Sequence, residues 1–165
     1  MLGRCIALAG GTDEWVPLGK LETIAAAVQA RGGTGAWTLA RAKVTATADA
    51  IEVEREPGRE PLPRLVLGPG SDAMWDGRFR VSVSEEFRGE LQVRALEAEG
   101  LAELRRRDAC PQPSRRLRLA PSFWRGGELC AVPCAGFWQE ERLQKVLYAE
   151  FTGLHYNPEV AQSIR

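Results

Sequence analysis

The chain has 165 residues, of which 44% are hydrophobic, and its 22 lysine and arginine residues balance 22 aspartate and glutamate residues. This composition excludes a disordered chain, and the balanced charge excludes a protein coated with positive charge for nucleic-acid binding over its whole surface. A chain of this length could bury about 70% of its unfolded surface, so it needs neither disulfides nor metals to fold.

The first predicted elements are two helices followed by a β-hairpin. Residues 2–10 form a short apolar helix, and the helical spacing of apolar residues from Leu18 to Val28 predicts a second one. Residues 37–47 are rich in threonine, valine and small side chains, and residues 51–55 alternate between apolar and charged. We expect these two segments to be paired strands joined by a turn at residues 48–50.

A linker and a strand-rich segment follow. Proline and glycine break the regular pattern at about residues 57–72, with one short strand at residues 65–67. Asp76-Gly77 predicts a tight turn. The strand after it places apolar side chains on one face and polar ones on the other: Phe79, Val81 and Val83 against Arg78, Arg80 and Ser82.

The C-terminal part continues with short elements. We expect a strand at residues 91–94, a short helix through Leu101 and Leu104, two strands that turn at Gly126-Gly127, and a last strand within residues 142–151. The predicted fold class is therefore α+β. It comprises a helical unit with a hairpin at residues 1–56, the linker at 57–72, a strand-rich substrate-binding unit at 73–151 and a loose tail at 152–165.

The cysteines and the N-terminus bear on the compartment. Four cysteines, Cys5, Cys110, Cys130 and Cys134, lack the spacing of a secreted disulfide framework. The apolar run at residues 2–9 is too short to span a bilayer and has no cleavage-site context. We expect a cytoplasmic protein without a membrane segment.

Two short segments resemble known functional motifs, a phosphate-binding loop and half of a zinc site, but both motifs are incomplete. Residues 9–14 resemble a degenerate Ser-Gly-Gly-x-Asp-Ser phosphate loop of N-type ATP pyrophosphatases, which would make the chain a free-standing enzyme. Ala9 and Glu14 replace both serines, so a helix end followed by a turn is the better interpretation. Cys130 and Cys134 match half of a zinc site, but His155 is the single histidine and the other half is missing. We expect no catalytic residue, cofactor or metal in this chain.

An arginine run between residues 105 and 118 is the best functional candidate. It holds six arginines opposed by Asp108 alone, and guanidinium groups match phosphate oxygens in geometry and charge. The alternative is a solvated surface in which these arginines pair with Glu97, Glu99 and Glu103. The residue types leave both interpretations open.

Four stretches in order resemble bacterial tRNA(Ile)-lysidine synthetases after their catalytic domain, over roughly residues 1–138. They are the helical start at residues 2–31, the hairpin ending Arg55-Glu56-Pro57, the segment Trp75-Asp76-Gly77-Arg78-Phe79, and residues 119–133, similar to the family's "Leu-Pro-x-Leu-Trp-x-Gly-x-x-Leu-Val-Ala-Val-Pro". The third stretch is the most specific. Ala120 between Leu119 and Pro121 departs from the family pattern.

The resemblance implies a role in handling tRNA. The family adenylates the wobble cytidine of an isoleucine tRNA with ATP, and free lysine then displaces AMP to give lysidine. ATP and lysine are substrates of the catalytic domain, so we expect this chain alone to release no AMP. Its implied partners are tRNA-Ile and that domain, in cis or in trans, and the alternative is a degenerate remnant acting as a non-catalytic interaction module. The candidate tRNA-binding residues are Arg78, Arg80, Arg105, Arg106, Arg107, Arg115, Arg116 and Arg118.

Overall fold

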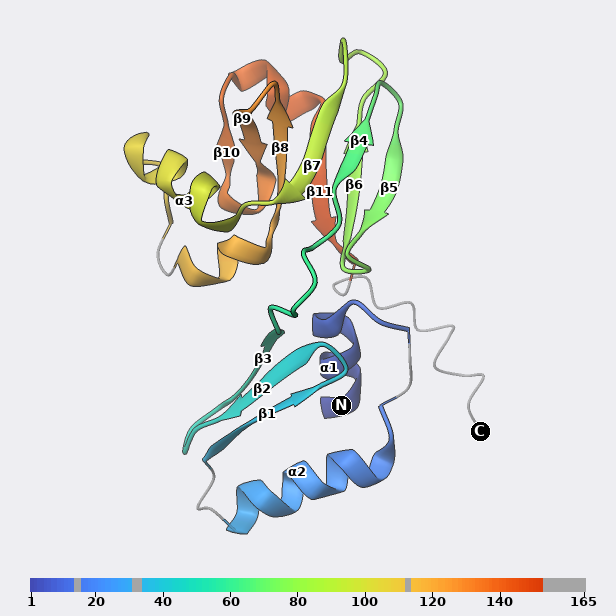
Figure 1. Ribbon diagram of the computed structural model, residues 1–165, viewed down its shortest axis with the longest axis vertical. Coiled ribbons are helices and arrows are strands. Elements are labelled where there is room, and N and C mark those ends of the chain that lie inside the picture. The colour runs from blue at the N-terminus through green and yellow to red at the C-terminus, as the bar shows by residue number, and fades with distance from the viewer. Residues whose placement is uncertain (14–15, 31–33, 112–113, 153–165) are drawn as a thin grey trace.

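The computed structural model describes residues 1–13, 16–30, 34–111 and 114–152, apart from the side chains of Ser114 and Arg115. Within these ranges the chain forms three α-helices and eleven strands, and all strand pairs are antiparallel. The predicted α+β class is confirmed, with a small helical N-terminal part followed by a strand-rich region (Figure 1). None of the described helices is long and apolar enough to cross a membrane.

The N-terminal unit packs helices against a three-stranded sheet (Figure 1). Its elements in chain order are α1 (Leu2–Gly10), α2 (Leu18–Ala30), β1 (Gly35–Leu39), β2 (Ala42–Ala46) and β3 (Ile51–Arg55). Helix α1 contacts β2 and β3, and its Ile6 is fully buried with Val16, Ala42 and Val44. The predicted helices at residues 2–10 and 18–28 are confirmed. Helix α1 packs its apolar face on the sheet, whereas α2 buries only Ile24 and leaves Leu18 exposed.

The region predicted as one strand, residues 37–47, is two strands, so that prediction is wrong. A tight turn at Ala40-Arg41 divides β1 from β2, with φ of 47° and 60° at these two residues. Such a turn normally requires glycine, asparagine or aspartate, because other side chains are strained at positive φ. The sequence therefore carries no local signal for it.

The C-terminal unit is built from two facing sheets. One has the strand order β10-β9-β8-β7-β4, and the other β11-β6-β5. Their strands are β4 (Leu65–Leu67), β5 (Asp72–Trp75), β6 (Phe79–Val83), β7 (Leu91–Ala95), β8 (Pro121–Arg125), β9 (Glu128–Val132), β10 (Phe137–Trp138) and β11 (Leu147–Phe151). Buried side chains from both sheets form one cluster, including Trp75, Val81, Val93 and Phe123. This shared cluster is the main core of the chain.

Short helices cover the ends of this unit. They are α3 (Glu97–Arg106) and the 3-10 helices η1 (Ser114–Leu119), η2 (Pro133–Ala135) and η3 (Glu141–Lys145). Helix α3 buries Leu101 and Leu104 against Trp124 and Leu129 in a second apolar cluster. The last predicted strand, within residues 142–151, is confirmed only in its second half, because residues 141–145 are helical.

The segment between the two units is attached to the second one. Residues 57–72, expected to be a linker, include β4, which pairs with β7. The indole of Trp75 donates a hydrogen bond of 2.8 Å to the carbonyl oxygen of Pro63. Of the expected tail, Thr152 donates to the carbonyl oxygen of Arg78 at 3.0 Å, and residues 153–165 lie outside the described residues.

The turn at Asp76-Gly77 is confirmed, with φ of 50° and 64°. After it, Phe79, Val81 and Val83 are buried, and Arg80 is exposed, as the alternation predicts. Arg78 is the exception, since only 7% of it is exposed although it was expected on the polar face. The cause is a buried carboxylate beside it, which is described below.

Candidate nucleic-acid interface

The arginines between residues 105 and 118 gather at one end of the C-terminal unit. Arg105 and Arg106 lie in the last turn of α3, and Arg107 follows it. The 3-10 helix η1 contacts α3 and carries the others. The members with exposed side chains are here called the arginine patch: Arg105, Arg106, Arg107, Arg116 and Arg118.

One glutamate holds two members of this patch. Glu103 accepts a hydrogen bond of 2.6 Å from Arg107 and also pairs with Arg106, whose side chain is 73% exposed. The hydrogen bond from Arg107, followed by the charge of Arg106, lowers the pKa of Glu103. Arg107 also lies over the ring of Phe137, 5.6 Å from its centroid. Three arginines, Arg105 to Arg107, against the two carboxylates of Glu103 and Asp108 leave the end of α3 with one net positive charge.

Arg116 pairs with the N-terminal unit and not with the glutamates of α3. Its Nε donates to Glu54 and its Nη2 to Glu52, both at 3.0 Å. All three side chains line a groove of about 1060 Å³ between the two units, which Arg118 also lines. The expected alternative, pairing with Glu97, Glu99 and Glu103, is therefore right for Arg106 and Arg107 and wrong for Arg116.

The remaining candidate residues are not part of this patch. Arg80 lies on β6 between the buried Phe79 and Val81, and its Nε donates to both carboxylate oxygens of Asp72 at 3.0 and 2.9 Å. Strand β6 itself lies away from α3 (Figure 1). This hydrogen bond lowers the pKa of Asp72 and raises that of Arg80. Arg78 is buried. The side chain of Arg115 lies outside the part that the structure describes.

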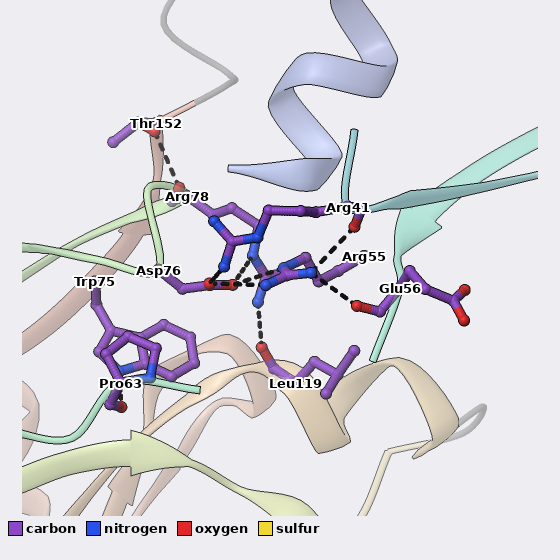
Figure 2. A network of polar contacts seen from close by, with 9 residues as sticks. All are labelled: Arg41, Arg55, Glu56, Pro63, Trp75, Asp76, Arg78, Leu119 and Thr152. Carbon is purple, nitrogen blue, oxygen red and sulfur yellow. Dashed lines mark hydrogen bonds and ion pairs between the residues drawn. The ribbon is translucent and has the colours of Figure 1, made fainter. Parts of the chain in front are cut away.

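A buried carboxylate at the contact between the two units explains the position of Arg78 (Figure 2). The side chain of Asp76 is fully buried, and it accepts hydrogen bonds from Arg41 at 3.0 Å, from Arg55 at 3.0 and 3.1 Å, and from Arg78 at 2.7 Å. Arg41 and Arg55 belong to the N-terminal unit, whereas Asp76 and Arg78 belong to the C-terminal one. We call these four residues the Asp76 joint.

Backbone carbonyl groups accept further hydrogen bonds from the two buried arginines of the joint. Arg55 donates to the carbonyl oxygens of Arg41 and Glu56 at 3.1 and 2.7 Å, and Arg78 donates to that of Leu119 at 2.6 Å (Figure 2). Burial alone would raise the pKa of Asp76, but the hydrogen bond from Arg55 and the charges of Arg78 and Arg55 outweigh it and lower the pKa. Asp76 is therefore ionised at neutral pH and ties the units together through charge-assisted hydrogen bonds.

Glycines allow the backbones to approach at the joint. A Cβ atom on Gly10 would lie 1.9 Å from the carbonyl oxygen of Ala40, and one on Gly11 would lie 2.0 Å from that of Asp76. A Cβ atom on Gly77 would likewise lie 2.2 Å from the carbonyl oxygen of Gly11. Gly11, with φ of 65°, also ends α1. The Gly10-Gly11 pair thus has a structural role at a helix end, where the alternative interpretation placed a phosphate loop.

Sequence reasoning did not identify Arg41 and Arg55 as partners of Asp76. The one local signal is Arg55, which ends an alternating strand at a buried position where an apolar residue is usual. Residues 21 and 35 positions apart in the chain form these contacts, so spacing gives no indication of them.

Metal and nucleophile chemistry finds little support in the described residues. No group of three or more histidine, cysteine, aspartate or glutamate side chains there is placed to hold a metal ion. Cys130 is buried, and burial raises the pKa of its thiol, which makes it a poor nucleophile at neutral pH.

Comparison with known proteins gives no relative. The chain matches no protein-family model, no curated protein and no solved structure.

Proposed function

We propose that this chain is a tRNA-binding and tRNA-positioning module of the type that follows the catalytic domain in tRNA(Ile)-lysidine synthetases. It acts in the cytoplasm on tRNA-Ile, together with a catalytic domain in cis or in trans that supplies the ATP and lysine chemistry. The proposal assigns binding to the arginine patch and positioning to the Asp76 joint.

The observation that carries the proposal is where the four family-like stretches meet. Gly11 from the first packs on Asp76, and Arg55 from the second bonds to it. Asp76 and Arg78 come from the third, and the carbonyl oxygen of Leu119 from the fourth accepts from Arg78. Segments far apart in the chain therefore share one contact, which is a reason for them to occur together and in this order.

A fixed joint suits a module that positions a large ligand. A buried, hydrogen-bonded carboxylate between two units limits their relative motion, so a surface on one unit keeps its place relative to the other. The arginine patch lies beside the groove that separates the units, and Arg116 and Arg118 line that groove. Phosphate contacts at such a place would fix the orientation of an RNA helix without reading its sequence.

Salt-dependent binding of tRNA-Ile tests the proposal. If about three to five arginines meet phosphates, the slope of log affinity against log salt is about −2 to −4. Replacing Arg105, Arg106 and Arg118 by alanine should weaken binding and flatten the slope by about two units. Filter binding at several salt concentrations measures both quantities.

The matched control replaces three exposed arginines outside the patch: Arg59, Arg88 and Arg142. It makes the same change in net charge, so equal losses in both triple variants would refute the patch as the binding surface. An absence of tRNA binding by the unmodified chain would refute the proposal itself, and the non-catalytic interaction module would take its place.

A further inference from the structure

Arg116 makes a second contact between the units, and it differs from the Asp76 joint in exposure. Its guanidinium group reaches Glu52 and Glu54 on β3, more than sixty residues away in the chain. The side chain of Arg116 is 61% exposed, that of Glu52 is 53% exposed and that of Glu54 is 28% exposed. Water therefore reaches this ion pair, whereas the Asp76 carboxylate is fully buried.

The two carboxylates occupy one of the edges through which the guanidinium group can bind a phosphate bidentately. A guanidinium group presents the same planar set of N–H donors to carboxylate and to phosphate oxygens. With Nε bonded to Glu54 and Nη2 to Glu52, a phosphate can take the bidentate Nε/Nη2 edge of Arg116 only by displacing at least one glutamate. Two negative charges beside one cation also repel a phosphate at this place.

We propose that Glu52 and Glu54 form a self-competing latch on the RNA site: they hold Arg116 across the groove until an RNA phosphate replaces them. This inference rests on the proposed function and names its regulation. Exposed ion pairs contribute little net stability, so the exchange is easy, while the buried joint keeps the two units attached.

A lysine on the neighbouring strand lies opposite one of the two glutamates that Arg116 would release. Lys43 on β2 lies directly opposite Glu54 on β3 in the antiparallel register. Facing cross-strand pairs of opposite charge attract each other. When Arg116 turns to a phosphate, Lys43 is the cation placed to approach Glu54 across the strands, which would lower the cost of the exchange.

The distribution of charge along the groove favours one side for the approach of RNA. Its lining includes six glutamates against five basic residues. The glutamates besides Glu52 and Glu54 are Glu56, Glu60, Glu97 and Glu99, and the basic residues are Lys43, Arg55, Arg78, Arg116 and Arg118. An RNA backbone is repelled from these glutamates and attracted to the arginines at the end of α3 and in η1. RNA therefore approaches from the arginine patch, in which Arg106 and Arg107 pair with Glu103 and Arg116 pairs with glutamates of the other unit.

The test is a change that should tighten binding. Glu52→Gln with Glu54→Gln keeps side-chain size and removes the competing charges, and we expect tRNA-Ile to bind about three- to tenfold more tightly at low salt. The control Glu85→Gln with Glu86→Gln removes the same charge from exposed glutamates after β6 and should change affinity less than twofold. Fluorescence anisotropy with labelled tRNA at low and high salt measures the difference.

A third variant identifies the arginine involved. Adding Arg116→Ala to the Glu52→Gln, Glu54→Gln double variant should abolish most of the gain, because the phosphate loses the cation that the latch released. If the unmodified chain binds tRNA and the double variant binds no more tightly, or the control tightens equally, the latch is overturned and the binding function stands. If none of these proteins binds tRNA, both are overturned.

Discussion

The Asp76 joint and the arginine patch use the same residue types in opposite ways. At the joint, three arginines contact one fully buried aspartate. Further donors of the buried Arg55 and Arg78 reach backbone carbonyl groups, whereas the side chain of Arg41 is half exposed. At the end of α3, Arg106 and Arg107 share Glu103 at the surface, with 73% and 36% of their side chains exposed. Burial makes the first group a structural connection, and exposure leaves the second able to exchange partners with a ligand.

Removing the buried carboxylate should have the largest effect. Asp76→Asn keeps the shape of the side chain but leaves three guanidinium groups without their anion, so we expect a loss of about 3 to 5 kcal/mol in the free energy of unfolding. Urea denaturation measures it. The control Asp72→Asn breaks the exposed pair with Arg80 and should leave the melting temperature within error of the unmodified chain.

Lowering the pH should remove the stabilisation that the ionised Asp76 carboxylate provides. The folded protein holds the pKa of Asp76 below its ordinary value of about 3.9. The stabilisation is therefore complete above about pH 4 and is lost as the pH falls through the folded pKa below that. We expect the difference in unfolding free energy between the unmodified chain and Asp76→Asn to be constant near neutral pH and to narrow below about pH 4. A constant difference down to pH 2 would contradict the role given to the ionised carboxylate.

The second largest loss of stability is expected from removing the aromatic ring of Phe79, which packs beside the Asp76 joint. Phe79 is 8% exposed, lies against Phe151 with ring centroids 5.4 Å apart, and has the guanidinium group of Arg78 5.1 Å from its centroid. Phe79→Ala should lower the free energy of unfolding by about 3 kcal/mol. Met74→Ala, on the same hairpin but half exposed, is the control and should change it by less than about 0.5 kcal/mol. A melting temperature unchanged in Phe79→Ala would contradict the core position.

The smallest effect is expected at Arg80. This arginine is as exposed as the members of the patch, but it lies on β6 in the other sheet and pairs with Asp72. Arg80→Ala should leave the melting temperature within error and change tRNA affinity less than twofold. Anisotropy titrations beside Arg118→Ala check this, and a larger loss at Arg80 would move the binding surface to that sheet.

Several elements were predictable because their signals are local. The helical spacing in α2, the Asp76-Gly77 turn and the alternation from Phe79 to Val83 each depend on neighbours a few residues apart. The turn at Ala40-Arg41 was missed because its residues are not those that tolerate positive φ. It persists where the side chain of Arg41 bonds to Asp76 and its carbonyl oxygen accepts from Arg55, so distant contacts compensate for its local strain.

Local patterns were enough to predict the two N-terminal helices, the turn after β5, the apolar face of β6 and the arginine-rich segment after α3. Which arginines are buried, and which carboxylate each one contacts, depends instead on how the segments pack in the folded chain. Arg78 and Arg80 are two residues apart and chemically identical, yet one bonds to a buried aspartate and the other to an exposed one. The reason is that an ion pair depends on distance and burial, which are set by contacts between segments that the chain brings together only on folding.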